Sequence, residues 1–255
     1  MTYIKLNGHK TWVHLPKGKR EIILLLHGGL SSSKSMLENV APSFGKHFAV
    51  AAFDRRGHGR TADTHVRFSI TDMAEETAAF IEHLGEPVHL LGFSDGGNTA
   101  LGLAMTRPDL VKRIIVVGAN WHRDGLVPLT QFTPTSVGFA DWAAHFGSMS
   151  PDGIAHAKIA VAKAEELFAT EPTWSVEDLQ KISTPTLVVS GDDDVVRLEH
   201  TVRLYEALPQ GQLCVVPAAT HSVMKEHPKL TARIFNDFLR MKLPPTTLYP
   251  QRRKS

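Results

Sequence analysis

The chain has 255 residues, of which 42% are hydrophobic and 21% charged, with a formal net charge of +2. This composition is ordinary for a soluble globular protein, and the length suits one large α/β domain. So small a net charge excludes a strong electrostatic field for nucleic acid or for a membrane surface, and we expect neither partner. The basic run at residues 252–254 follows a Pro-rich stretch and is interpreted as a solvated tail. The sequence leaves the oligomeric state open.

The single cysteine, Cys214, excludes an intrachain disulfide and fits a reducing compartment. It lies in an apolar run, so we expect a buried, inert strand residue. The N-terminus shows no signal-peptide pattern, and no apolar run approaches the roughly 18 residues that a membrane-spanning helix needs. A cytoplasmic location is therefore expected.

Residues 3–6 and 11–15 alternate in polarity around Asn7 and Gly8, which predicts a β-hairpin. Further along, six apolar runs are continuous rather than alternating, as is typical of strands covered on both faces. They occupy residues 21–26, 48–53, 88–91, 113–117, 186–189 and 213–216. Together with the hairpin they predict a sheet of eight strands.

Segments with helical spacing separate these runs. Residues 70–84 form one, and Ser69 with Asp72 three residues later resembles a capping box at its start. Two more helices are predicted within residues 202–208 and 230–239. Strands alternating with helices predict an α/β fold with a doubly wound, mostly parallel sheet.

Residues 121–182 break this alternation. They are rich in Ala, His, Phe and Trp and contain no strand-like run, so we interpret them as a small helical insertion, called the cap here. Its Ala-rich part, residues 154–168, is the clearest helix. The predicted organisation is a core of residues 1–120 and 183–255 with the cap at residues 121–182.

The pattern G-x-S-x-G follows the apolar run at 88–91, and a helical pattern follows it, in Gly92-Phe93-Ser94-Asp95-Gly96-Gly97. This order predicts a nucleophile elbow, in which the chain leaves a buried strand, turns sharply at a serine and enters a helix. The glycines flanking Ser94 fit because a Cβ there would crowd a strained turn. The alternative is a glycine-rich turn that carries a serine by chance.

A serine nucleophile needs a general base, and the base needs an orienting carboxylate. In open α/β sheets such groups lie just past the carboxyl ends of strands. Two adjacent strand ends supply them: Gly191 is followed by three aspartates at 192–194, and His221 follows the strand at 213–216. The chain order Ser, Asp, His is the one expected of this architecture.

Negative charge on the substrate oxygen requires two N–H donors, which form an oxyanion hole. The backbone N–H of Asp95, directly after the serine, is one candidate. The second is expected in the loop after His27 and Gly28, from Gly29, with Leu30 as the alternative.

These motifs resemble those of the α/β-hydrolase superfamily over essentially the whole chain, with similarity to its haloperoxidase-like members. The matching segments are residues 27–29, 54–60, 92–97, 191–194, 220–222 and 226–228. The resemblance implies that Ser94 is the nucleophile, His221 the base and Asp194 the acid. Serine at the elbow, where dehalogenases and epoxide hydrolases of similar fold have aspartate, argues against those two chemistries. The sequence departs from the family at Thr220, where glycine is common, and at Asp95, where methionine is common.

Other polar residues receive structural interpretations. We expect His27 to support its loop, and His58 with the neighbouring arginines to shape a turn after a strand. His200 and His227 are expected at the surface. Neither HExxH nor a tight Cys/His cluster occurs, so no metal site and no cofactor are expected. About half of the cap aromatics are expected to form the core of the cap and the rest to line an acyl pocket; they are Trp121, Phe132, Phe139, Trp142, Phe146 and Trp174.

The predicted function is a cofactor-free serine hydrolase that cleaves a small carboxylic ester, a small-molecule substrate, through an acyl-enzyme. The alternatives at the same site are perhydrolysis, opening of a lactone, and cleavage of aminoacyl esters or amides. A ligand-binding receptor of the same fold is the alternative from a different functional class.

Overall fold

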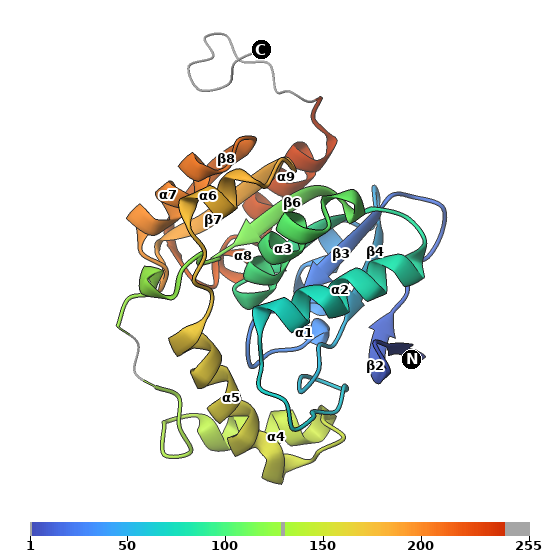
Figure 1. Cartoon of the computed structure of the whole chain (residues 1–255), viewed down its shortest axis with the longest axis vertical. Helices are drawn as coiled ribbons and strands as arrows, with labels where there is room; N and C mark the ends of the chain where they lie inside the picture. Colours follow the sequence, from blue (N-terminus) through green and yellow to red (C-terminus); the bar gives the residue numbers. More distant parts are fainter. Residues whose placement is uncertain (1, 129–130, 243–255) are drawn as a thin grey trace.

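The computed structural model describes residues 2–128 and 131–242, so the basic run at 252–254 lies outside the described residues. One eight-stranded sheet runs through the molecule in the order β1-β2-β4-β3-β5-β6-β7-β8 (Figure 1). Its strands are β1 Thr2–Leu6, β2 His9–His14, β3 Ile22–Leu26, β4 Ala49–Phe53, β5 Val88–Phe93, β6 Val111–Val117, β7 Thr186–Asp193 and β8 Gly211–Thr220. The prediction of eight strands is confirmed.

The hairpin forms the antiparallel edge of this sheet. β1 pairs with β2, and β2 pairs with β4, both antiparallel. The pairings from β4 through β3, β5, β6 and β7 to β8 are all parallel. All carboxyl ends of the parallel strands therefore meet at one edge of the sheet, which is where ligands bind in open α/β folds.

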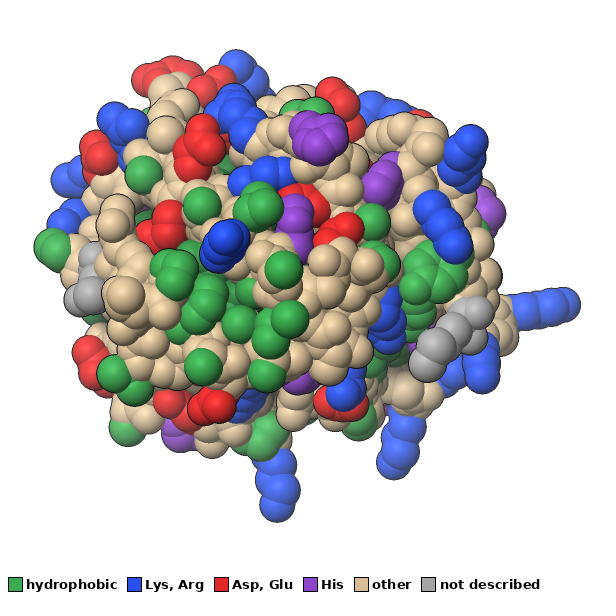
Figure 2. Space-filling view, turned by 90° about the horizontal axis from the view of Figure 1, so that it is seen from below, with side chains coloured by type: hydrophobic (Ala, Val, Ile, Leu, Met, Phe, Trp, Pro, Cys, Tyr) green, Lys and Arg blue, Asp and Glu red, His purple; other side chains and the backbone are tan. Residues whose placement is uncertain are grey.

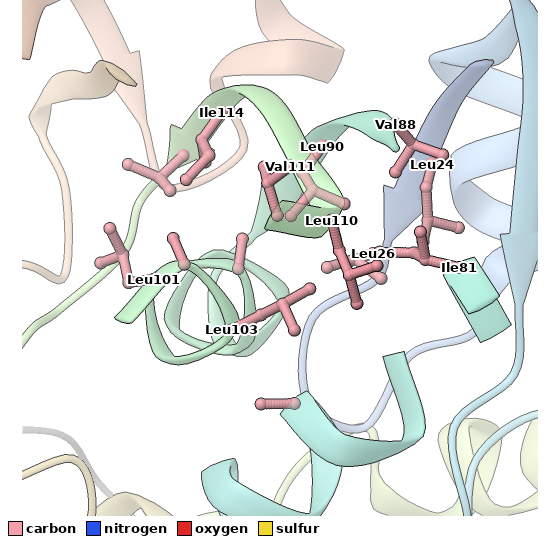
Figure 3. Packing of buried hydrophobic residues seen from close by; sticks show 14 of the residues in the cluster. Leu24, Leu26, Ile81, Val88, Leu90, Leu101, Leu103, Leu110, Val111 and Ile114 are labelled. Atoms are coloured by element: carbon pink, nitrogen blue, oxygen red, sulfur yellow. The ribbon is translucent and has the colours of Figure 1, made fainter. Parts of the chain in front are cut away.

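Helices cover both faces of the sheet. Within the described residues, seven helices do so: α1 Ser33–Asn39, α2 Ile70–Leu84, α3 Asp95–Thr106, α6 Val176–Gln180, α7 Leu198–Ala207, α8 Val223–Glu226 and α9 Pro228–Arg240. Two more, α4 Phe139–Met149 and α5 Ala157–Thr170, belong to the cap. One apolar core joins the sheet to α2, α3, α6 and α7. In Figure 3, Leu24 and Leu90 of the strands and Leu101 of α3 lie in this core. A second core joins the opposite face to α1, α8 and α9.

Helix α2 matches the predicted range, but its start differs from the predicted capping box. Ser69 is the N-cap residue, yet its side chain makes no cap hydrogen bond. Instead, Glu171 Oε2 accepts a hydrogen bond from the Ile70 backbone N–H at 2.8 Å. A carboxylate from the cap thus satisfies one of the free N–H groups at the start of α2, where an anionic acceptor is favoured.

Within the cap, α4 and α5 lie below the sheet and its covering helices in Figure 1. The predicted helix at 154–168 begins with a 3₁₀ turn at Ile154–His156 and continues as α5 to Thr170. Figure 2 views this side of the molecule, where apolar side chains gather in the centre among charged ones. The division of the chain at residues 120 and 183 stays a prediction.

Two further sequence expectations concern burial and membranes. Cys214 is only half-buried, since β8 is the last strand of the sheet. Burial nevertheless raises the pKa of its thiol, which fits the expected inert residue. Among the residues that the structure describes, no helix is both long enough and apolar enough to span a bilayer.

Candidate active site

Ser94 forms the turn between β5 and α3. Its backbone has φ 53° and ψ −122°, a strained conformation for a residue with a side chain. Hydrogen bonds hold the turn on both sides: Ser94 N donates to Val117 O at 2.8 Å, and Gly97 N donates to Ser94 O at 2.7 Å. Ser94 is partly exposed while the residues after it are buried, so the hydroxyl lies at the surface of a rigid turn.

The glycines of the motif are required by close backbone packing. A Cβ on Gly92 would overlap the Gly96 carbonyl, and a Cβ on Gly96 would overlap the Leu26 carbonyl. β3, β5 and α3 therefore approach one another more closely than any side chain would allow. The strained serine is held in place by this packing.

The imidazole of His221 is oriented by Asp194. Its Nδ1 lies 2.7 Å from Asp194 Oδ1, and the Asp194 side chain is only 1% exposed. The same carboxylate accepts hydrogen bonds from the Val196 N–H at 3.1 Å and from the Ser190 hydroxyl at 3.3 Å. Burial alone would raise the pKa of Asp194, but the His221 contact and these donors lower it below its ordinary value. The site thus contains an ionised carboxylate bonded to Nδ1, which leaves Nε2 for proton transfer.

This imidazole lies against the elbow. The ring of Phe93, the residue before the serine, is 4.9 Å from the His221 ring, centroid to centroid. Gly118, at the end of β6, approaches so closely that a Cβ there would lie 2.7 Å from His221 Nδ1. The structure thus brings Asp194 and His221 into contact at the carboxyl edge of the sheet and places the imidazole against Phe93, the residue before Ser94.

The other two aspartates occupy different places. Asp192 and Asp193 belong to β7, which extends beyond the predicted run, and both are exposed. Asp192 Oδ1 accepts a hydrogen bond from the Ala219 N–H at 3.1 Å, and Asp193 is in register with Thr220. Only Asp194, the first residue past the strand, contacts the imidazole.

Backbone donors surround the serine. Asp95 begins α3, so its N–H has no acceptor within the helix. On the other side, His27 Nδ1 lies 2.8 Å from Gly28 O, and in a trans peptide the N–H of Gly29 then points the opposite way. Gly28 packs directly beside Ser94, since a Cβ there would lie 3.2 Å from Ser94 Cβ. This arrangement favours Gly29 over Leu30 as the second donor.

His27 is fully buried and held by Arg55. The Arg55 Nη2 donates to His27 O at 2.7 Å, and the Arg55 backbone N–H donates to His27 Nε2 at 3.3 Å. Burial, assisted by the positive charge of Arg55, lowers the pKa of His27 well below its ordinary value. A neutral imidazole that accepts at Nε2 donates at Nδ1, as the Gly28 contact requires. His27 thus supports its loop, and Arg55, a charged residue of 1% exposure, is the supporting residue that sequence reasoning missed.

The side chain of Asp95 is also buried, with 5% exposure. Its Oδ2 finds no hydrogen-bond partner among the described residues. Burial raises the pKa of this carboxyl, and the charges of Arg55 and His221 oppose that rise. Asp95 and Phe168 of α5 both pack against Gly29, since a Cβ on Gly29 would overlap Asp95 Oδ2 and lie 2.9 Å from Phe168 Cζ.

A cavity of about 850 Å³ begins at this loop. Its lining combines apolar residues such as Leu30, Phe132 and Phe168 with charged ones such as Arg123, Glu165 and Arg197, and of the described residues that line it none is Ser94, Asp194 or His221. Of the predicted cap aromatics, Phe139, Trp142 and Phe146 pack as a cluster within the cap, with neighbouring ring centroids 5.4–6.0 Å apart. Phe168 was not among the aromatics singled out from the sequence, because nothing in its local pattern distinguishes it.

His200 is not a surface residue as expected. It is buried, stacked on Trp121 at 4.6 Å, and its Nε2 accepts a hydrogen bond from the Trp121 N–H. Burial lowers its pKa to about 4. The helical spacing of residues 202–208 did not reveal this contact, because the covering residues come from the beginning of the cap. Among the described residues, no group of histidine, cysteine or acidic side chains has the arrangement of a metal site.

Comparison with known proteins identifies the family. The Alpha/beta hydrolase family matches residues 23–234. The chain belongs to this family. The 2-hydroxy-6-oxo-6-(2'-aminophenyl)hexa-2,4-dienoic acid hydrolase of Metapseudomonas resinovorans is 26% identical over 251 residues, 89% of this chain and 86% of the relative. The (E)-2-((N-methylformamido)methylene)succinate hydrolase of Acinetobacter baylyi is 24% identical over 242 residues, with 86% and 90% covered.

The fold is also similar to that of a solved hydrolase structure. A crystal structure of a serine hydrolase involved in carbazole degradation matches 94% of this chain and 98% of its own, with a TM-score of 0.76 and 23% identity. The relatives named above are hydrolases, which supports the conclusion that this chain is a hydrolase of the α/β-hydrolase family.

Proposed function

We propose that the protein is a serine hydrolase that cleaves a small carboxylic ester through an acyl-enzyme, without a cofactor. The observation that carries the proposal is the 2.7 Å contact between His221 Nδ1 and the buried Asp194 carboxylate, made directly beside the Ser94 elbow. A base oriented by a carboxylate and placed at a strained serine is the arrangement that activates a hydroxyl for attack.

The proposed reaction has two halves, formation of the acyl-enzyme and its hydrolysis, and the same groups act in both. Ser94 Oγ attacks the ester carbonyl while His221 Nε2 takes its proton, and Asp194 stabilises the imidazolium that forms. The carbonyl oxygen becomes an oxyanion, which accepts hydrogen bonds from the Asp95 and Gly29 N–H groups. His221 then protonates the departing alcohol. Water, deprotonated by His221, releases the acid and regenerates the serine.

The cavity supports a substrate with an apolar part. It is bordered by Leu30, Phe132 and Phe168, and Leu30 directly follows the proposed second oxyanion donor. We propose that an acyl group bound at Ser94 extends past Leu30 and buries its apolar surface there. The names of the two relatives denote hydrolysis of a dienoic acid and of a succinate derivative, so acid-bearing acyl compounds belong in the substrate test.

A second candidate, hydrolysis of aminoacyl esters or amides, is favoured by the Asp95 side chain. Its buried Oδ2 has no partner among the described residues, and it lies beside Gly29, next to the reacting centre. An α-amine on the acyl group would supply the missing donor and a compensating positive charge. Perhydrolysis and lactone opening would use the same three residues, and a ligand receptor would use the cavity alone.

A panel of p-nitrophenyl esters of increasing acyl length, with lactones, aminoacyl esters and acid-bearing acyl compounds added, tests the proposal. We expect the neutral short esters to be cleaved and Ser94→Ala and His221→Ala to lose turnover by several orders of magnitude. A preference for aminoacyl esters that Asp95→Asn removes, with neutral esters unaffected, would select the second candidate. Normal turnover by a purified, folded Ser94→Ala variant would contradict the assignment.

A further inference from the structure

The cap contacts the proposed oxyanion loop through one directional bond. Trp142, in α4, donates its indole Nε1–H to the carbonyl oxygen of Leu30 at 2.9 Å, and the two residues are 112 positions apart in sequence. Leu30 directly follows Gly29 and has φ 52°. A branched residue rarely adopts this left-handed region, so the loop keeps this shape only if its surroundings hold it.

The loop is held at both ends. On the core side, His27 bonds the carbonyl of Gly28, which orients the Gly29 N–H. On the cap side, Trp142 bonds the carbonyl of Leu30. Gly29 lies between the two anchors, and as a glycine it has the greatest backbone freedom in the loop. Loss of either anchor would therefore let the Gly29 N–H depart from its direction.

Trp142 is itself well ordered by its neighbours. Its ring lies 5.4 Å from Phe146, 5.8 Å from Phe132 and 6.0 Å from Phe139, centroid to centroid. These contacts join the indole to the rest of the cap, while its N–H reaches out of the cluster to the loop. The bond consequently transmits the position of the cap to the backbone beside Ser94.

We propose that Trp142 is a positioning residue for the oxyanion hole, through which the cap determines the catalytic competence of the core. The proposal rests on the proposed function, since it gives the Gly29 N–H its role. Trp142 does not touch the reacting atoms. It fixes the Leu30–Ser31 peptide, which is separated from the peptide of the Gly29 N–H by the Gly29–Leu30 peptide alone. The donor must lie within about 2.7–3.1 Å of the oxyanion to stabilise it.

The test replaces Trp142 by phenylalanine, which keeps an aromatic ring in the cluster but removes the indole N–H donor together with part of the ring volume. Complete loss of one oxyanion donor costs about 10²–10³-fold in kcat. A displaced donor should cost less, so we expect kcat to fall about 10-fold with KM within a factor of two. Labelling by a fluorophosphonate, whose attack by serine needs the same oxyanion stabilisation, should slow by a similar factor.

Trp121→Phe is the matched control. Trp121 also donates its indole N–H to a backbone carbonyl, that of His200 at 3.2 Å, but at a place outside the loop. It should lose little kcat, even where its melting temperature falls as far as that of Trp142→Phe. Such a result would separate positioning from a general cost of losing a tryptophan.

Three outcomes would overturn the proposal: unchanged kcat in Trp142→Phe, equal loss of kcat in both variants, or a rise in KM alone. Its failure is distinguishable from failure of the proposed function. If Ser94→Ala abolishes turnover and Trp142→Phe does not reduce it, only the role of Trp142 is wrong. If Ser94→Ala remains active, the serine assignment itself is wrong.

Discussion

Asp95 Oδ2 lies in the space beside Gly29 that the Cβ of any other residue at position 29 would occupy. The two residues come from different elements, the start of α3 and the loop after β3, and their N–H groups are the two proposed oxyanion donors. Their close packing means that the distance between the donors is set by side-chain contact as well as by the backbone. A change of one atom at this place should therefore affect the reaction.

Gly29→Ala tests this packing. The new methyl group would overlap Asp95 Oδ2 and press on Phe168, so the loop or the carboxyl must move. We expect a loss of kcat of about 10-fold or more and a destabilisation of about 1–3 kcal/mol. Gly45→Ala is the control, because the nearest atom to a Cβ there is 4.0 Å away. Equal rates of ester hydrolysis by the two variants would show that the close contact between Gly29 and Asp95 does not affect the reaction.

Asparagine substitutions at residues 192, 193 and 194 separate the three aspartates. Asp194→Asn should reduce kcat by about 10⁴-fold, because an amide cannot maintain the correct tautomer of His221. Asp193→Asn should be close to wild type, since the side chain is exposed. Asp192→Asn should affect stability more than kcat, because Asp192 bonds the Ala219 N–H. If Asp192→Asn or Asp193→Asn were the inactive variant, the assignment of Asp194 would be incorrect.

A buried ion pair connects the core to the cap. Asp63 Oδ2 lies 2.7 Å from Lys163 Nζ and 2.8 Å from His156 Nε2, and the Asp63 side chain is 2% exposed. Removal of one partner of a buried pair leaves an uncompensated charge. We expect Asp63→Asn to lower the free energy of unfolding by about 2–3 kcal/mol, as measured by urea titration.

The control for that experiment is Glu38→Gln. Glu38 pairs with Lys34 at 3.9 Å, and both side chains are largely exposed. Exposed pairs contribute about 0–1 kcal/mol, so the urea midpoint should barely change. Equal effects of Asp63→Asn and Glu38→Gln would show that the connection between core and cap contributes no more than a surface pair.

Buried histidines predict a loss of stability in mild acid. Burial lowers the pKa of His58 to about 4, and burial likewise lowers the pKa values of His89 and His200 to about 4. Between about pH 6.5 and pH 4 the unfolded chain binds protons at these sites and the folded chain does not. The free energy of unfolding should therefore decrease as the pH is lowered through this range, by up to about 1.4 kcal/mol per pH unit for each histidine.

Urea titrations of wild type and His58→Gln at pH 7, 6 and 5 measure this slope. The variant has one titrating group fewer, so its free energy of unfolding should depend less steeply on pH, whatever its stability at pH 7. Parallel pH dependences for the two proteins would show that His58 is not held neutral by the fold.

Much of the fold could be predicted because apolar runs covered on both faces leave an unmistakable pattern, as residues 22–26 show. The ends of the strands are harder to predict. β7 continues to Asp193 although its last two residues are aspartates, and β8 continues to Thr220 through Pro217, because the two extensions pair with each other. Such pairing depends on a partner distant in sequence, which hydrophobic periodicity does not record.

The candidate site shows the same division. Ser94, Asp194 and His221 were predicted because each follows a strand in a fixed chain order. The residues that support them were not: Arg55 was placed in an ordinary turn, whereas the structure buries it against His27. Trp142 carried no signal for its bond to Leu30, since a contact between cap and core has no local sequence pattern.

Ser94 is proposed to be a nucleophile activated by His221 and Asp194. Labelling with a fluorophosphonate, followed by mapping of the modified peptide by mass spectrometry, tests it most directly. We expect one adduct, on Ser94, formed rapidly by wild type and slowed by several orders of magnitude in His221→Ala. Modification of another residue, or a His221→Ala variant that labels as fast as wild type, would contradict it.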